Sequence, residues 1–160
     1  PSSPTVSGSS ETPLGTIGVS TNGVAIFSND AGPGDTLSKE AGTFDTYAGH
    51  PQQQGVYHYH AEPIYLTSTN TANLIGVSLD GYAIYGTKCD NGTSDTSDDY
   101  SPASPSSSPT GTGLDSNHGH TTTTTHFSTA TYHYHVGLDS TAGITTIFGD
   151  YFHGAPGSAR

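Results

Sequence analysis

The chain has 160 residues, the length of one domain, and a formal net charge of −11 with only three basic side chains. This charge repels nucleic acid and anionic membrane surfaces, and no hydrophobic run is long enough to span a bilayer. We therefore expect no nucleic-acid partner and no membrane span, and a surface that attracts cations.

The composition favours β structure. There is no Trp and no Met, so Val, Ile, Leu, Phe and ten tyrosines must build the core, and β-branched and aromatic residues suit a pleated surface. Asn22-Gly23 and Asp80-Gly81 are strong signals for tight hairpin turns. We predict an all-β single domain with long loops, one helical turn at 37–41, and strands at 16–20, 23–28, 56–60, 64–67, 74–79, 82–85, 121–125 (at an edge), 131–136 and 143–148.

Two polar tails flank this domain, which we place at 14–154. Residues 1–13 are rich in Ser, Thr and Pro, a composition typical of disorder, and 155–160 form a second tail. If the first tail is ordered, it lies across its own domain or adds to the sheet edge of a neighbouring copy. We predict the second arrangement, because an unprotected sheet edge is a template for another chain. A head-to-tail contact of this kind gives a homo-oligomer or a filament.

Residues 87–113 interrupt the domain with an acidic, Ser- and Pro-rich insertion. We interpret it as a solvated surface loop. An O-glycosylated stretch or a weak calcium loop is the alternative, although the ligand spacing of an EF-hand is missing.

The sequence Tyr-His-Tyr-His occurs twice, at 57–60 and at 132–135. Successive side chains of a strand point to opposite faces, so each copy places two tyrosines on one face and two histidines on the other. We expect the tyrosines to be core aromatics. Two such strands side by side would bring four imidazoles together: His58, His60, His133 and His135.

The repetition extends beyond the tetrapeptide. An Asp, three residues and a Gly-His pair precede each copy, at 45–50 and 115–120, and the segment 23–27 is echoed at 81–85. Blocks repeated in one order predict an internal duplication with pseudo-twofold symmetry. The halves would span about 14–68 and 73–154.

At these motifs the chain resembles the YHYH domain proteins. The similarity runs from about Asn22 to Gly154 and includes both tetrapeptides, both Gly-His pairs and the segment Leu79–Gly86. Many members carry a Cys immediately before the Gly-His pair, where this chain has Ala48 and His118. The resemblance implies a secreted or surface protein and no particular activity.

Nine histidines favour a transition metal, because imidazole suits zinc, copper, nickel and iron, whereas calcium prefers oxygen. We predict one shared site that binds a divalent ion, with copper or zinc favoured and calcium as an alternative. Its ligands would be the four histidines of the tetrapeptides with His50 or His120, and Asp45 and Asp115 would ligate or orient an imidazole. The competing interpretation is that the Asp and Gly-His blocks only hold a loop onto a YHYH strand. We assign His118, His126 and His153 no role in the metal site.

Two further residues bear on the setting. Cys89 is the sole cysteine, so we expect a buried apolar residue or an interchain link. Asn91-Gly92-Thr93 is a glycosylation acceptor triplet, and a removed signal peptide would explain why the chain starts at Pro1.

We therefore expect a secreted or surface-exposed metal-binding β protein, more structural than catalytic, that forms the protomer of an extracellular assembly. The alternatives are a copper or zinc metalloenzyme with an open histidine site, and a metal-scavenging carrier. An open coordination position beside a cleft would favour the enzyme.

Overall fold

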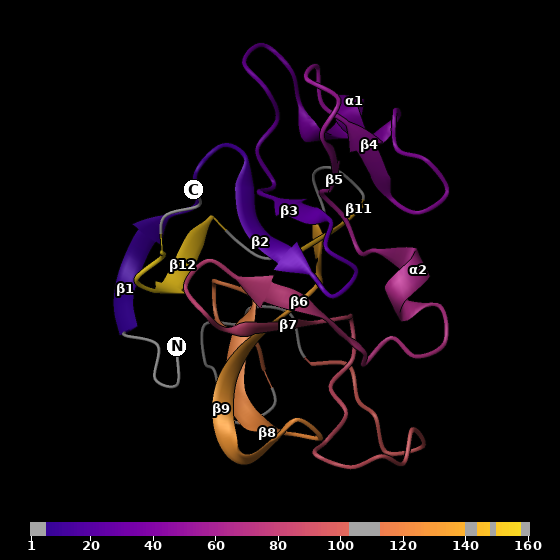
Figure 1. Cartoon of the computed structure of the whole chain (residues 1–160). Helices are drawn as coiled ribbons and strands as arrows, with labels where there is room; N and C mark the ends of the chain where they lie inside the picture. Colours follow the sequence, from indigo (N-terminus) through magenta and orange to yellow (C-terminus); the bar gives the residue numbers. More distant parts are fainter. Residues whose placement is uncertain (1–5, 103–112, 140–143, 148–149, 158–160) are drawn as a thin grey trace.

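The computed structural model describes residues 6–102, 113–139, 144–147 and 150–157 (Figure 1), and the predicted all-β fold is confirmed. Two short helices and twelve strands lie in these ranges. The helices are α1 (Leu37–Ala41) and α2 (Ile64–Thr67), and no helix there is long and apolar enough to cross a membrane. The strands are β1 (Val6–Glu11), β2 (Thr16–Ser20), β3 (Ala25–Phe27), β4 (Gly49–Pro51), β5 (Tyr57–Tyr59), β6 (Leu74–Ser78), β7 (Ala83–Tyr85), β8 (Gly119–Thr124), β9 (Phe127–His135), β10 (Gly137–Asp139), β11 (Ile144–Thr146) and β12 (Tyr151–Gly154).

Eight strands form one sheet in the order β4-β5-β3-β2-β6-β7-β9-β8. The pairs β3–β5 and β7–β9 are parallel, and the other neighbours in this sheet are antiparallel. Parallel neighbours need a long crossover, and the chain provides one between β3 and β5 and another between β7 and β9. β8 is an edge strand, as predicted for the Thr run.

The strand order is symmetric about the β2–β6 pair (Figure 1), because β4-β5-β3-β2 on one side corresponds to β8-β9-β7-β6 on the other. The two central strands share the sequence Ile-Gly-Val-Ser, at 17–20 and 75–78. Val19 faces Val77, and Gly18 and Gly76 each face a serine of the other strand. This arrangement supports the predicted duplication, which remains an inference from the pattern.

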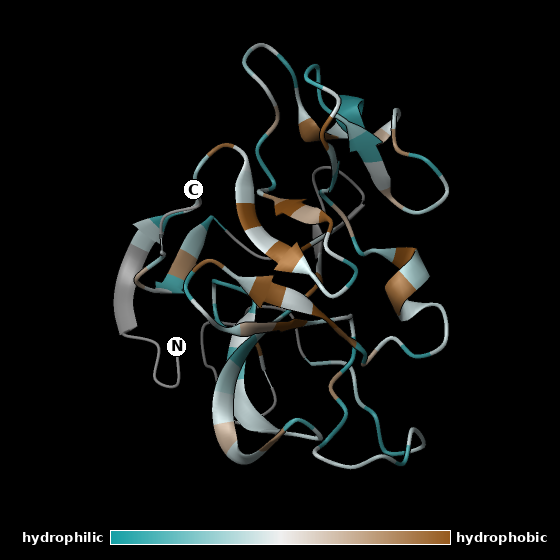
Figure 2. Cartoon of the chain, in the orientation of Figure 1, coloured by the Kyte–Doolittle hydropathy of each residue, from teal (hydrophilic) through white to brown (hydrophobic). Residues whose placement is uncertain are grey.

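The tyrosine side of the tetrapeptides faces the core, as predicted. Tyr59, Tyr132 and Tyr134 are buried in one cluster with isoleucines of the central strands, and Tyr57 packs against it. Figure 2 shows hydrophobic residues concentrated in β2, β3 and β6, at the centre of the sheet. Burial of these side chains supplies most of the favourable free energy of folding. The histidines of each tetrapeptide therefore lie on the opposite side of the sheet.

One predicted strand is wrong. Ile64–Thr67 forms α2, whose first turn closes through hydrogen bonds from the Leu66 and Thr67 amides to the Pro63 carbonyl. Ile64 and Tyr65 are more than half exposed, so this short apolar run does not enter the sheet. Periodicity cannot separate strand from helix in a run of four residues.

Residues 6–11, which lie in the predicted N-terminal tail, form β1 and pair with β12 of the same chain. This two-stranded sheet is separate from the large one. The arrangement matches the alternative in which the tail lies across its own domain, and exchange with a neighbouring copy stays a prediction. β4, β10 and β12 were also not predicted as strands.

The β2–β6 contact allows a direct test. A Cβ on Gly76 would lie 2.5 Å from the Val19 carbonyl oxygen, in the middle of the sheet. Overpacking of this kind costs about 1–3 kcal/mol, so we expect Gly76→Ala to lower the free energy of unfolding by that amount. Urea unfolding followed by circular dichroism measures it. Gly157→Ala is the matched control, since its Cβ would meet the Leu79 carbonyl at an ordinary 3.5 Å. Equal stability of both variants would contradict the prediction.

Candidate metal centres

The first YHYH segment fixes the tautomer of two buried imidazoles. His58 Nδ1 lies 3.1 Å from the Val56 carbonyl oxygen, and His60 Nδ1 lies 2.7 Å from that of Ser28. A carbonyl only accepts, so each Nδ1 carries a hydrogen and, in the neutral ring, each Nε2 presents a lone pair. These two Nε2 atoms lie 3.0 Å apart. With both rings neutral, neither Nε2 has a proton to donate to the other.

His50 completes this first group. β4 pairs with β5 so that His50 faces His58, and the ring centroids lie 4.6 Å apart. His50 Nδ1 contacts the Thr43 hydroxyl at 2.6 Å, so Nε2 is the nitrogen of His50 that remains for a metal ion. One nitrogen from each of His50, His58 and His60 lies within 4.8 Å of the others. We call these three residues the all-histidine group.

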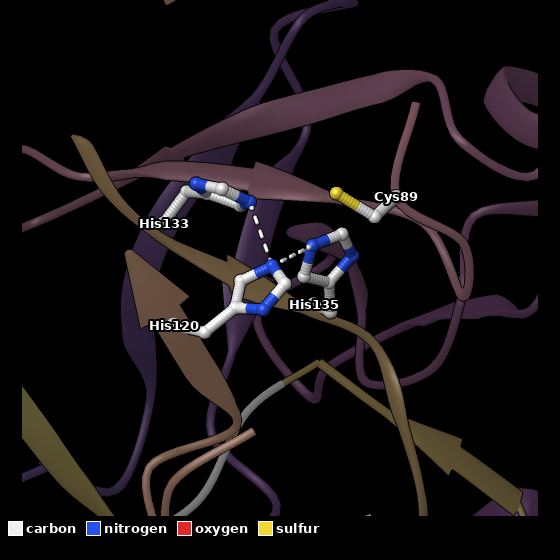
Figure 3. Close-up of side chains that lie close together, drawn as sticks. All are labelled: Cys89, His120, His133 and His135. Carbon is white, nitrogen blue, oxygen red and sulfur yellow. Dashed lines mark hydrogen bonds between the residues drawn. The ribbon is translucent and has the colours of Figure 1, made fainter. Parts of the chain in front are cut away.

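The second YHYH segment repeats the arrangement with a fourth member. His133 Nδ1 donates to the Thr131 carbonyl and His135 Nδ1 to that of Gly86, each at 2.9 Å. The Nε2 atom of His120 lies 3.1 Å from that of His133 and 3.2 Å from that of His135. Figure 3 shows the three imidazoles turned toward one another, with the Cys89 sulfur beside them. We call Cys89, His120, His133 and His135 the cysteine-histidine group.

Cys89 enters this group through the inserted loop. Its amide donates to the Tyr100 carbonyl at 2.9 Å, and the Tyr100 amide donates back at 3.1 Å, so a small β-bridge holds the residue in place. The side chain is buried, and Sγ lies 3.7 Å from the Thr122 hydroxyl on β8. The prediction of a buried cysteine is confirmed, but its position beside three imidazoles was not anticipated.

The spacing of the nitrogens fits a single bound ion. Two nitrogens bound to zinc at about 2.0–2.1 Å with a tetrahedral angle lie about 3.3 Å apart. The closest Nε2 pairs of the two groups are separated by 3.0–3.2 Å. In the second group the short distances would also fit a hydrogen bond, with Nε2–H of His120 as the donor and Nε2 of one neighbour as the acceptor. In the first group no such hydrogen bond can form between neutral His58 and His60, because both carry their hydrogen on Nδ1. Both groups could therefore hold a metal ion.

Asp45 and Asp115 accept hydrogen bonds from backbone amides and from tyrosines of the YHYH strands. Asp45 Oδ1 accepts from the Gly49 amide at 3.3 Å, and both carboxylate oxygens accept from the Tyr57 hydroxyl. Asp115 has the same partners, the Gly119 amide and the Tyr132 hydroxyl. Each carboxylate thus ties a Gly-His loop to a tyrosine of the YHYH strand, as in the competing interpretation. Because these hydrogen bonds come from amides and tyrosines, the two aspartates position β4 and β8, and the charge of Asp115 also acts on His120 by raising its pKa against the larger effect of burial.

The tight loops before the Gly-His pairs explain the glycines. Ala48 and His118 have positive φ angles of 65° and 63°, and β4 and β8 begin at the glycine that follows each of them. A Cβ on either Gly49 or Gly119 would collide with the hydroxyl of the adjacent tyrosine. The Gly-His spacing therefore serves both the turn and the placement of the histidine.

The prediction of one shared site is wrong. β5 and β9 are separated by β3, β2, β6 and β7 in the large sheet, so the two tetrapeptides cannot meet. The six predicted histidines instead divide between two groups, one in each half. Of the other histidines, His126 contacts the Tyr85 hydroxyl at 3.1 Å and His153 stacks on Tyr132, outside both groups.

The acidic insertion contributes no cluster of three or more carboxylates in the part of the chain that is described, and a calcium loop there stays a prediction. The carboxylates of Asp90, Asp95 and Asp98 accept hydrogen bonds within the loop or from Thr125 and form no cluster there. Asn91, the glycosylation candidate, is exposed in this loop with φ of 52°, and its modification stays a prediction.

Sequence reasoning missed Cys89 and Glu40. Glu40 lies on α1, and its Oε2 is 3.3 Å from His60 Nε2. Both residues come from long crossover loops with no repeated pattern. A lone cysteine in a histidine-rich chain was the single available signal.

The chain belongs to the YHYH protein family, whose pattern matches residues 1–108. This match includes the first tetrapeptide and β7 but ends before the second tetrapeptide. No curated protein and no solved structure matches the chain significantly. The family match therefore covers the first half and the start of the second, and the repeated motifs and the strand order relate the rest of the second half to the first.

Burial sets the charge state of both groups. It lowers the pKa of His58 and of His120 to about 4, and that of His135 to about 3, because the charged form loses its hydration. Neighbouring imidazoles lower these pKa values further. The pKa values of His60 and His133 lie below their ordinary value for the same main reason.

These shifts predict the acid stability of the metal-free protein. A histidine in the unfolded chain has a pKa of about 6.5. Between about pH 6.5 and 4 these histidines therefore bind protons in the unfolded chain but stay neutral in the folded chain. Stability should therefore be highest above that range and fall as the pH drops through it. The urea midpoint of chelator-treated protein at several pH values measures this. A midpoint that stays constant over the interval would contradict the assignment.

Proposed function

We propose that the chain is a metal-binding β protein with two sites of different kinds. The observation that carries the proposal is the pair His58 and His60, whose δ-protonated rings turn two bare Nε2 atoms toward each other at 3.0 Å. A shared cation removes the repulsion between these lone pairs. Imidazole and thiolate ligands favour zinc or copper over calcium.

The cysteine-histidine group has the composition of a closed structural site. Its four members are all buried, and three nitrogens with one sulfur are the number and types of ligands that a tetrahedral structural zinc site requires. It links β8 and β9 to the inserted loop that carries Cys89. A metal there would join the inserted loop to β8 and β9, so its binding energy would add to folding.

Metal analysis tests the proposal. Protein loaded with zinc and dialysed should retain two ions per chain, one for each group. Cys89→Ser should lower the affinity of one site and leave one tightly held ion, because a hydroxyl is a far weaker ligand than a thiolate. With cobalt, the thiolate charge-transfer band should be present in the parent and absent in the variant.

His126→Ala is the matched control, since His126 is an exposed histidine outside both groups. It should keep both ions and the cobalt band. Full-length protein that retains no zinc would refute the proposal, and a Cys89→Ser variant with an unchanged cobalt spectrum would remove the cysteine from it.

We also propose that the chain self-associates in an extracellular setting. Two observations support this: β1 pairs with β12 outside the main sheet, and the acceptor Asn91 is exposed. A strand that pairs within a chain can pair with the same partner in another copy, at little cost in contacts. Exchange of β1 would then link copies head to tail.

Deletion of residues 1–11 tests the exchange. The truncated chain should remain folded, because the buried core lies in the later strands, and it should lose any association. Sedimentation velocity gives the mass distribution of the full and truncated chains. A peptide of residues 1–13 added to the truncated chain should bind the vacated edge of β12. Identical mass distributions would exclude the exchange.

A further inference from the structure

The two groups differ in their access to solvent. The all-histidine group lines a cavity of about 610 Å³, whose wall also includes Phe27, Glu40 and Gln52. His50 is half-buried, whereas all four members of the cysteine-histidine group are buried. The first group also supplies three ligands where the second supplies four. Three protein ligands with an accessible fourth position distinguish catalytic metal sites from structural ones.

A carboxylate is already in place beside this open position. Glu40 Oε1 accepts from the Gly32 amide at 3.1 Å, which orients the side chain. Oε2 is buried, has no hydrogen-bond donor among the described residues, and lies 3.3 Å from His60 Nε2. Because neutral His60 donates through Nδ1 to the Ser28 carbonyl, its Nε2 then offers this carboxylate no hydrogen. A buried acceptor without a donor calls for a partner in the cavity, such as a water molecule.

We propose that the all-histidine group is the centre of a hydrolase in which Glu40 is the general base; this rests on the proposed metal binding. A divalent ion held by three imidazoles polarises a carbonyl and lowers the pKa of water. Water from the cavity attacks the carbonyl carbon of an ester or amide, and Glu40 accepts its proton. The bond from that carbon to the leaving oxygen or nitrogen then breaks, and Glu40 returns the proton to the leaving atom. One water is consumed, and a carboxylic acid and an alcohol or amine are formed.

The charged groups of the cavity wall and of the whole chain influence which substrates can enter. Asp30, Asp35 and Glu40 line it together with one ammonium, that of Lys39, which is paired with Asp35 at 3.2 Å. Three carboxylates against one ammonium make the metal-free wall negative, and a bound divalent ion would offset this charge, whereas the chain as a whole, at −11, stays acidic. The acidic surface of the chain disfavours the approach of phosphate esters and carboxylates and favours neutral or cationic acyl compounds. Gln52 and its two neighbours offer amide donors and acceptors at the rim.

Zinc-loaded full-length chain should hydrolyse p-nitrophenyl acetate faster than an equal concentration of free zinc. It should discriminate against the anionic succinyl ester of p-nitrophenol. Glu40→Gln should retain both zinc ions and lose kcat/KM by about 100-fold or more, the usual contribution of a general base. Glu11→Gln is the matched control, because Glu11 is exposed on β1 and should leave the rate unchanged.

The outcomes separate the two proposals. Two bound zinc ions with no rate above free zinc would overturn the hydrolase and leave the metal-binding proposal intact. A chain that binds no zinc would defeat both. If Glu40→Gln loses an ion, Glu40 is a ligand and its assignment as base is wrong. Circular dichroism confirms that each variant is folded, and Glu40→Asp, which keeps the carboxylate, should recover part of the lost rate.

Discussion

The hydrogen bond from Nδ1 of each YHYH histidine to a backbone carbonyl is the interaction on which the rest of the structure depends. It appears four times, and each time it fixes the tautomer and turns Nε2 away from the strand. The accepting carbonyls belong to Val56, Ser28, Thr131 and Gly86. The carbonyls of Ser28 and Gly86 directly follow β3 and β7, the parallel neighbours of the YHYH strands. The unusual parallel pairs are thus what bring an acceptor within reach of His60 and His135.

The two halves share a scaffold and differ in what closes the site. In both, a glycine-histidine loop is tied to a tyrosine by an aspartate, and an aromatic residue of the parallel strand lies against the imidazoles: Phe27 stacks on His58, and Tyr85 lies edge-on to His133. The difference lies in the crossover loops. One loop carries Cys89 into the core, and the other carries Glu40 to the wall of a cavity. A common frame therefore presents two histidine groups of different accessibility without change to the strands.

Much of the frame could be predicted from the sequence because it rests on local chemistry. The alternation of Tyr and His sets the two faces of β5 and β9, and the Asn22-Gly23 and Asp80-Gly81 turns set the hairpins. The pairing of distant strands could not be predicted, since a repeated motif does not say whether its copies are neighbours or lie in separate halves. The roles of Cys89 and Glu40 could not be predicted for a related reason. Their positions depend on long irregular loops, where no periodicity constrains the path of the chain.

The contact between β2 and β6 has a consequence for the edges of the sheet. The shared Ile-Gly-Val-Ser segments pair antiparallel with Val19 opposite Val77, so equivalent residues of the two strands make equivalent contacts with each other. A contact with this property is isologous. One half alone would expose that strand edge, and two identical copies could join through it in the same register. In the present chain the two strands belong to one polypeptide, so this contact covers within the molecule an edge that would otherwise be open to another chain.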